Sequence, residues 1–252
     1  MVSAPAAMAG TGAAAPAPGH FYFRTGLSVD WSKETEFRDV DCSSQSPDAL
    51  YGCGTGPDGA PYQSRGDFGT IAGFEVGVGY IAFPHLRIEA DLQYRPGFSF
   101  EGHANFLSQD RRQEVSVDAS SWSAMLFGYL DLPGPGGPRL GPFSPFVGGG
   151  IGVSRIETGE THMEFPKTRT IVPGGHRTNL TWSLAAGLAI SVDERTTLEI
   201  AWRYTDLGTV ETGGGAGRVV WRDGSQEKPI DLAETQARLR THGLSLSMRY
   251  AF

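Results

Sequence analysis

The feature that most constrains this chain is an alternation of apolar and polar residues that recurs along most of its length. In segment 86–95, Leu, Ile, Ala, Leu and Tyr alternate with Arg, Glu, Asp, Gln and Arg. Successive side chains of a β-strand point to opposite faces, whereas an α-helix repeats every 3.6 residues. The alternation therefore predicts a strand with one apolar and one polar face, not a helix.

Eight segments carry this pattern or a Gly-rich variant of it, which suits one all-β domain in a chain of 252 residues. They are 20–31, 72–82, 86–95, 122–130, 146–153, 180–190, 198–204 and 237–252. Short connections at 83–85, 132–142 and 193–195 take turns with long polar segments at 32–67, 96–116, 157–177 and 206–236. This alternation of turns and loops is typical of membrane barrels, whose short turns face the periplasm. We therefore expect an all-β fold, an eight-stranded antiparallel up-and-down transmembrane β-barrel with both termini on the short-turn side.

The residues of the polar face indicate whether that face points into the barrel or outward. A soluble lipocalin-like barrel would turn its apolar face inward, but mixed charges among small residues suit the narrow interior of an eight-stranded barrel. The expected lumenal charges are Arg24, Glu75, Arg87, Glu89, Asp91, Arg95, Glu199, Arg203 and Arg249. Buried charges are tolerated when they are paired, so we expect an ion-pair plug. A thin water path along the same residues is the alternative.

Large aromatic residues on the apolar face lie near the strand ends. Trp31, Tyr94, Trp122, Trp182 and Tyr204 are expected at the long-loop end, and Phe21, Tyr80, Tyr250 and Phe252 at the short-turn end. Amphipathic rings collect at the two membrane–water interfaces, so the pattern predicts two aromatic girdles. A soluble sandwich with an aromatic core is the less favoured interpretation.

Composition is compatible with a barrel and argues against a nucleic-acid partner. No run approaches the roughly 20 apolar residues of a membrane helix, whereas a membrane strand needs only about 10. The net charge is −7, and the basic residues are scattered, with Arg111-Arg112 and the pair Arg238 and Arg240 as the densest groups. Phosphate binding to nucleic acid needs clustered Lys and Arg.

Two cysteines, Cys42 and Cys53, lie in one Gly/Ser/Asp/Pro-rich stretch. Metal binding would require further Cys or His at ligand spacing, and none lies nearby. A disulfide in an oxidising compartment is favoured over two free thiols. The first 19 residues, rich in Ala, Pro and Gly, are interpreted as a signal remnant or a flexible periplasmic lead, and 20–252 as the barrel.

No enzymatic, metal or cofactor site is predicted. The glycine runs 148–152 and 213–215 lack a following Gly-Lys-Ser/Thr, and the six histidines are dispersed. His242 and Ser245 invite comparison with outer-membrane lipid deacylases, but residues three apart on a strand face opposite sides.

Three segments resemble small opacity-protein and OmpA-type outer-membrane barrels. They are the Gly-rich run 143–153, the run 198–208 and the chain end, where Leu244, Leu246, Met248, Tyr250 and Phe252 resemble the outer-membrane assembly signal. The resemblance covers 20–252. It implies the outer membrane of a Gram-negative bacterium, contact with membrane lipid and lipopolysaccharide, and handling by the barrel-assembly machinery.

The resemblance fixes function less closely, because such barrels serve as adhesins, structural proteins or narrow pores. We expect a structural, surface-exposed barrel whose loops contact a host or envelope protein. A narrow porin-like channel is the alternative, and a lipid-modifying enzyme is a third hypothesis with little support.

Overall fold

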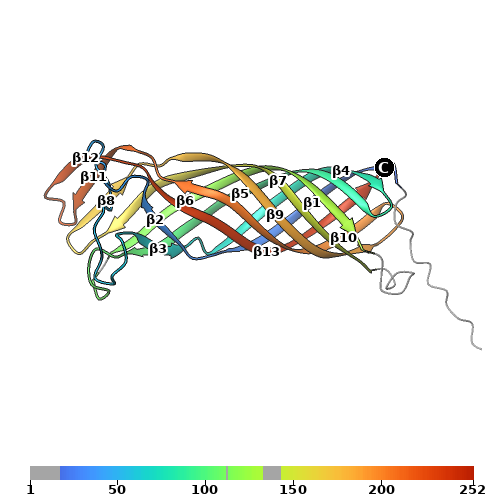
Figure 1. Cartoon of the computed structure of the whole chain (residues 1–252), viewed down its shortest axis with the longest axis horizontal. Coiled ribbons are helices and arrows are strands. Elements are labelled where there is room, and N and C mark those ends of the chain that lie inside the picture. Colours follow the sequence, from blue (N-terminus) through green and yellow to red (C-terminus); the bar gives the residue numbers. More distant parts are fainter. Residues whose placement is uncertain (1–17, 112, 133–142) are drawn as a thin grey trace, which may run out of the picture.

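The computed structural model describes residues 18–111, 113–132 and 143–252. Within these residues the fold is entirely β, and eight antiparallel strands form a ring (Figure 1). The ring strands are β1 (Phe21–Ser32), β4 (Thr70–Phe83), β5 (Leu86–Ala104), β6 (Glu114–Asp131), β7 (Phe143–Glu164), β9 (His176–Ser191), β10 (Thr196–Glu211) and β13 (Thr235–Ala251). The last strand pairs with the first from Tyr22–Ala251 to Ser32–Thr241, which closes the barrel. The predicted eight-stranded barrel is confirmed.

The two ends of the barrel differ. Tight connections after β4 and β9, and the end of the chain, lie at one end, which we call the turn end (Figure 1). Most of the predicted lead 1–19, nearly all of the predicted turn 132–142 and Arg112 lie outside the described residues. We call the opposite end the loop end.

Five shorter strands gather at the loop end. They are β2 (Thr35–Asp39), β3 (Ser64–Asp67), β8 (Thr168–Val172), β11 (Gly215–Trp221) and β12 (Glu227–Leu232) (Figure 1). Strands β2 and β3 fill the wall between β13 and β5, while β8, β11 and β12 extend the sheet from β7. The sequence prediction of long polar loops was therefore wrong for much of 96–116, 157–177 and 206–236, where the ring strands continue or the short strands β8, β11 and β12 lie.

The strands continue because apolar and polar residues still alternate in these segments. There the apolar residues face the interior and the polar ones face outward, the reverse of the turn-end part. On β5, a register shift between Arg95 and Phe98 leaves Pro96 and Gly97 both exposed. Residues at even positions face outward before this bulge, and Phe98 and Phe100 face inward after it. A bulge inserts one extra residue and so moves every later side chain to the opposite face.

The two largest groups of apolar side chains lie in different places, and smaller clusters, such as that of Phe127 and Phe146, lie inside the turn-end part of the barrel. Over the turn-end part of the barrel one large group covers the outer wall, for example Leu126 and Leu246, which are 55% and 60% exposed. At the loop end the other forms an interior core of sixteen described residues that includes Phe37, Phe100 and Leu239. No helix in the described part of the chain is long and apolar enough to cross a bilayer.

Candidate functional sites in the lumen, on the outer wall and at the loop end

The lumen holds a balanced set of charges. Among the described residues it contains five arginines and five carboxylates, none more than 6% exposed, so the set carries no net charge. The arginines are Arg24, Arg87, Arg95, Arg203 and Arg249, and the carboxylates are Asp30, Glu75, Glu89, Asp91 and Glu199. All nine predicted lumenal charges point inward, as does Asp30, which lies on the same polar face of its strand.

Glu75 on β4 lies at the centre of one ion cluster. Its carboxylate accepts hydrogen bonds from Arg24 on β1 at 2.7 Å and from Arg203 on β10 at 3.2 Å. Arg24 also donates to Glu89 at 3.1 Å and lies 3.7 Å from Asp91. One carboxylate on β4 thus joins its neighbour β1 to β10, a strand with which β4 does not pair.

Glu199 on β10 organises a second cluster nearer the turn end. It lies 3.2 Å from Arg87 and 3.4 Å from Arg249, and Arg87 also lies 3.1 Å from Asp131. The Arg87 guanidinium sits 4.8 Å from the ring centroid of Tyr129. A cation over an aromatic face is attracted by the ring quadrupole, so the rings stabilise charges that water does not reach.

The sequence reasoning missed these inward aromatic residues, although the strand pattern contained a signal for them. Tyr129 and Phe127 occupy polar-face positions of β6, opposite the glycine run of β7. A Cβ added at Gly148 would lie 2.3 Å from the Tyr129 ring, and one at Gly150 would lie 2.6 Å from Phe127. The run therefore makes room for two rings inside the wall.

A third ion pair and the apolar core follow toward the loop end. Arg95 donates to Asp30 at 3.1 Å. Beyond it, the ring of Phe100 packs against Phe37 at 4.9 Å and Phe68 at 5.4 Å between centroids. The described lumen is thus filled by ions in one part and by apolar side chains in the next.

The outer wall carries the predicted aromatic residues in contacting pairs. Tyr94 stacks on Trp122 at 4.0 Å, Trp182 lies 5.4 Å from Tyr204, and Phe21 lies 4.9 Å from Tyr80. Trp31 lies 6.0 Å from His242, which the sequence reasoning did not include. The residues of the predicted assembly signal, Leu244, Leu246, Met248, Tyr250 and Phe252, are each 42–66% exposed on this wall. Their reading by an assembly machinery stays a prediction.

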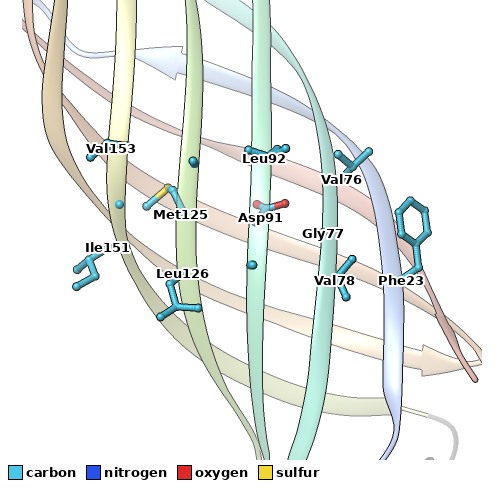
Figure 2. Close-up of a pocket in the computed structure, with 13 residues that line it drawn as sticks. Phe23, Val76, Gly77, Val78, Asp91, Leu92, Met125, Leu126, Ile151 and Val153 are labelled. Carbon is cyan, nitrogen blue, oxygen red and sulfur yellow. The ribbon is translucent and has the colours of Figure 1, made fainter.

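A shallow depression of about 560 Å³ lies on this outer wall (Figure 2). Small side chains at Ala90 and Ala124 form its floor, and larger ones such as Leu126, Ile151 and Phe23 surround it. The strands beneath stay paired without interruption from Val76–Leu92 to Leu126–Ile151. The depression is therefore a feature of the apolar surface and not an opening into the lumen.

The loop end is held together by specific contacts. Cys42 and Cys53 form the predicted disulfide, with their Cα atoms 4.9 Å apart. The Asp39 carboxylate accepts three consecutive backbone N–H groups, from Leu50 to Gly52. Tyr51 donates to the Ser64 hydroxyl at 2.7 Å, and burial raises the pKa of the Tyr51 phenol. The first long connection is thus a fixed structure.

A pocket of about 730 Å³ opens on the loop end between 57–66 and 103–113. Asn105 holds its two sides together by accepting the Gln63 N–H at 2.8 Å and donating to Asp58 at 3.0 Å. The hydrogen bonds from the Ala60 N–H and from Asn105 keep the pKa of Asp58 below its ordinary value. Arg65 and His103 lie on the rim, exposed to solvent.

Two further arrangements bear on catalysis. Among the described residues, no group of three or more His, Cys, Asp or Glu side chains could hold a metal ion. His242 faces outward beside Trp31, whereas Ser245 is 2% exposed and faces the lumen. These two side chains do not meet.

Residues 2–252 match the family model described as the outer membrane protein beta-barrel domain. The chain belongs to this family. An uncharacterized protein of Brucella suis is 29% identical over 153 residues, which are 53% of this chain and 50% of that protein. The match therefore spans about half of this curated relative.

Solved barrels are similar in fold but distant in sequence. The outer membrane protein OprG of Pseudomonas aeruginosa is 12% identical, covering 94% of this chain and 98% of its own, with a TM-score of 0.47. Neisserial surface protein A is also 12% identical, covering 92% and 97%, with a TM-score of 0.42. The family and the relatives in Brucella show that this chain belongs to the outer membrane of a Gram-negative bacterium.

Proposed function

We propose that this outer-membrane barrel is a closed structural protein whose loop end is displayed outside the cell for contacts with other molecules. The proposal rests on the observation that two different sets of side chains fill the lumen, one after the other along the barrel axis. Glu75 and Glu199 each bind arginines inside the membrane-spanning part, and the core around Phe100 fills the loop end. A solute would have to break both in series.

The loop end supports the second half of the proposal. The disulfide, the turn around Asp39 and the short strands fix its shape, and its pocket offers both guanidinium and carboxylate groups at the rim. Recognition residues are commonly carried on loops held by a rigid scaffold. A host or envelope protein is the partner that such a surface suits.

Single-channel conductance of the refolded protein in a planar bilayer tests whether the barrel is closed. We expect no steady current from the unaltered protein, nor from Arg203→Ala or Phe100→Ala alone. The double variant Arg203→Ala/Phe100→Ala removes one side chain from the ion clusters and one from the apolar core, and its channel should open measurably more often. Arg155→Gln, on the outer wall, is the matched control. Steady ion-selective openings of the unaltered protein would make this barrel a narrow channel instead.

Surface display is tested by labelling intact cells with a membrane-impermeant amine reagent. The three lysines of the sequence, Lys33, Lys167 and Lys228, all lie at the loop end. We expect Lys167 and Lys228 to react on intact cells. Arg195→Lys adds an amine at the turn end, which should react only after lysis. Labelling of the Arg195→Lys position alone would reverse the proposed orientation.

A further inference from the structure

Three cations lie on the outer wall directly beyond the aromatic residues of β1, β10 and β13. Arg238 and Arg240 project outward from β13, with side chains 57% and 45% exposed. Lys33 follows β1, and its backbone N–H donates to the carbonyl oxygen of Arg240 at 2.9 Å. The pairing of the two strands therefore fixes where the three charges stand relative to one another.

Asp206 on β10 holds the two guanidinium groups in place. It lies 2.8 Å from Arg238 and 3.2 Å from Arg240, and its own side chain is only 4% exposed. The arginines thus cover the carboxylate and keep their remaining N–H groups toward the surface. Three cations against one carboxylate leave the cluster with a net charge of about +2 at neutral pH. The neighbouring Glu34 is engaged elsewhere, 3.4 Å from Arg65.

The cluster stands at the height of lipid headgroups. The Lys33 ammonium lies 5.3 Å from the ring centroid of Tyr204, and His242 separates Arg240 from the apolar position Leu244 on the same face of β13. Aromatic rings settle where the hydrocarbon ends, and lysine and arginine reach past them toward the headgroups. The next polar groups outward from the membrane are therefore these cations.

The opposite wall is charged differently around its aromatic pair. There Arg155 lies level with Trp122 and pairs with Glu157 at 2.8 Å, and farther out Ser99 donates to Asp118 at 2.6 Å. These residues sum to a net negative charge. The outer wall on the β1–β13 side is thus more positive than the wall that carries Tyr94 and Trp122.

We propose that Lys33, Arg238 and Arg240 form a binding site for a phosphate group of lipopolysaccharide in the outer leaflet. Guanidinium groups bind phosphate through parallel N–H donors, and charge-assisted hydrogen bonds are stronger than neutral ones. The site rests on the proposed orientation, with the loop end outside the cell, and not on whether the lumen is closed.

Native mass spectrometry of the refolded full chain in detergent with added lipid tests the site. The probes are diphosphorylated lipid A, the same lipid with its phosphates removed, and phosphatidylglycerol. The variant Lys33→Gln/Arg240→Gln leaves the Arg238–Asp206 pair intact, so the buried carboxylate keeps a partner. We expect it to bind diphosphorylated lipid A about tenfold more weakly than the unaltered protein does.

The control Arg155→Gln, which removes an exposed cation from the opposite wall, should bind diphosphorylated lipid A as the unaltered protein does. Removal of the phosphates from the lipid should abolish the difference between the unaltered protein and the double variant. If phosphatidylglycerol shows the same dependence on Lys33 and Arg240 at equal strength, the phosphate site stands but lipopolysaccharide as its source is overturned. Equal retention of the two lipid A forms, or an equal loss in Arg155→Gln, would overturn the site.

Discussion

The membrane-spanning part and the loop end of this barrel are built from the same strands with opposite polarity. On β5, Glu89 faces the lumen and Ile88 the outside, whereas farther along Phe100 faces the lumen and Glu101 the outside. The difference follows the solvent outside the wall. Apolar side chains face outward where lipid surrounds the barrel, and inward where water does.

The two parts are stabilised by different forces. The lumen of the membrane-spanning part gains order from paired charges, whose desolvation offsets much of their attraction. The loop end gains from apolar burial, as a small soluble domain does. A change to one partner of an ion pair should therefore weaken the first part, and a cavity should weaken the second.

The largest expected effect is that of Glu75→Ala. Glu75 is the carboxylate that faces Arg203, so its loss leaves a buried guanidinium without an ion partner in the described part of the chain. Removing one member of a buried pair typically costs about 3–5 kcal/mol. Urea unfolding of the protein in lipid vesicles measures it.

A double variant controls for the lost side-chain volume at this position. Glu75→Ala/Arg203→Ala removes both charges, and we expect it to recover part of the stability that Glu75→Ala loses. If the double variant were as unstable as the sum of the two single ones, the pair would contribute nothing as a pair.

These two parts also differ in how far the sequence predicted them. The membrane-spanning strands, the lumenal charges and the outward aromatic residues followed from period two alone, because one solvent surrounds them throughout. At the loop end the same reasoning predicted loops. On β6 the apolar residues change from odd positions, such as Val117, to even ones, such as Trp122. On β5 the phase stays constant, and the bulge after Arg95 changes the face instead.

Neither the change of phase on β6 nor the bulge on β5 can be recognised from the sequence without knowing which strands pair. A change of phase also occurs where a strand ends, and a bulge depends on the residues opposite it. The cation cluster around Asp206 was hidden for the same reason. Asp206 is 32 positions from Arg238, Lys33 lies in the first part of the chain, and these residues meet only when β13 pairs with β1 and β10.

A smaller effect is expected for Phe100→Ala, in the core of the loop end. The side chain is fully buried between Phe37 and Phe68, and its truncation should cost about 3 kcal/mol in that part of the molecule. Amide hydrogen exchange should show faster opening of β2 and β3 while the pairs of β1 with β13 stay protected.

The matched control is Phe74→Ala, on the lipid-facing wall. Phe74 is 53% exposed, so its truncation leaves no interior cavity and should leave exchange at the loop end unchanged. Equal loss of protection along the whole barrel in Phe100→Ala would show that the two parts unfold as one unit. It would contradict the claim that they are stabilised separately.

The smallest effect concerns the response of the loop end to acid. Hydrogen bonds from the Ala60 N–H and Asn105 hold the pKa of Asp58 below its unfolded value. The stabilisation from this carboxylate is therefore present above the unfolded pKa and is lost as the pH falls through the folded one. We expect the protection factor of the Ala60 amide to fall in that window below the ordinary aspartate pKa, while β1 and β13 stay protected. Asp58→Asn should remove the pH step. A step that persisted in this variant would assign the acid response to another carboxylate of the pocket.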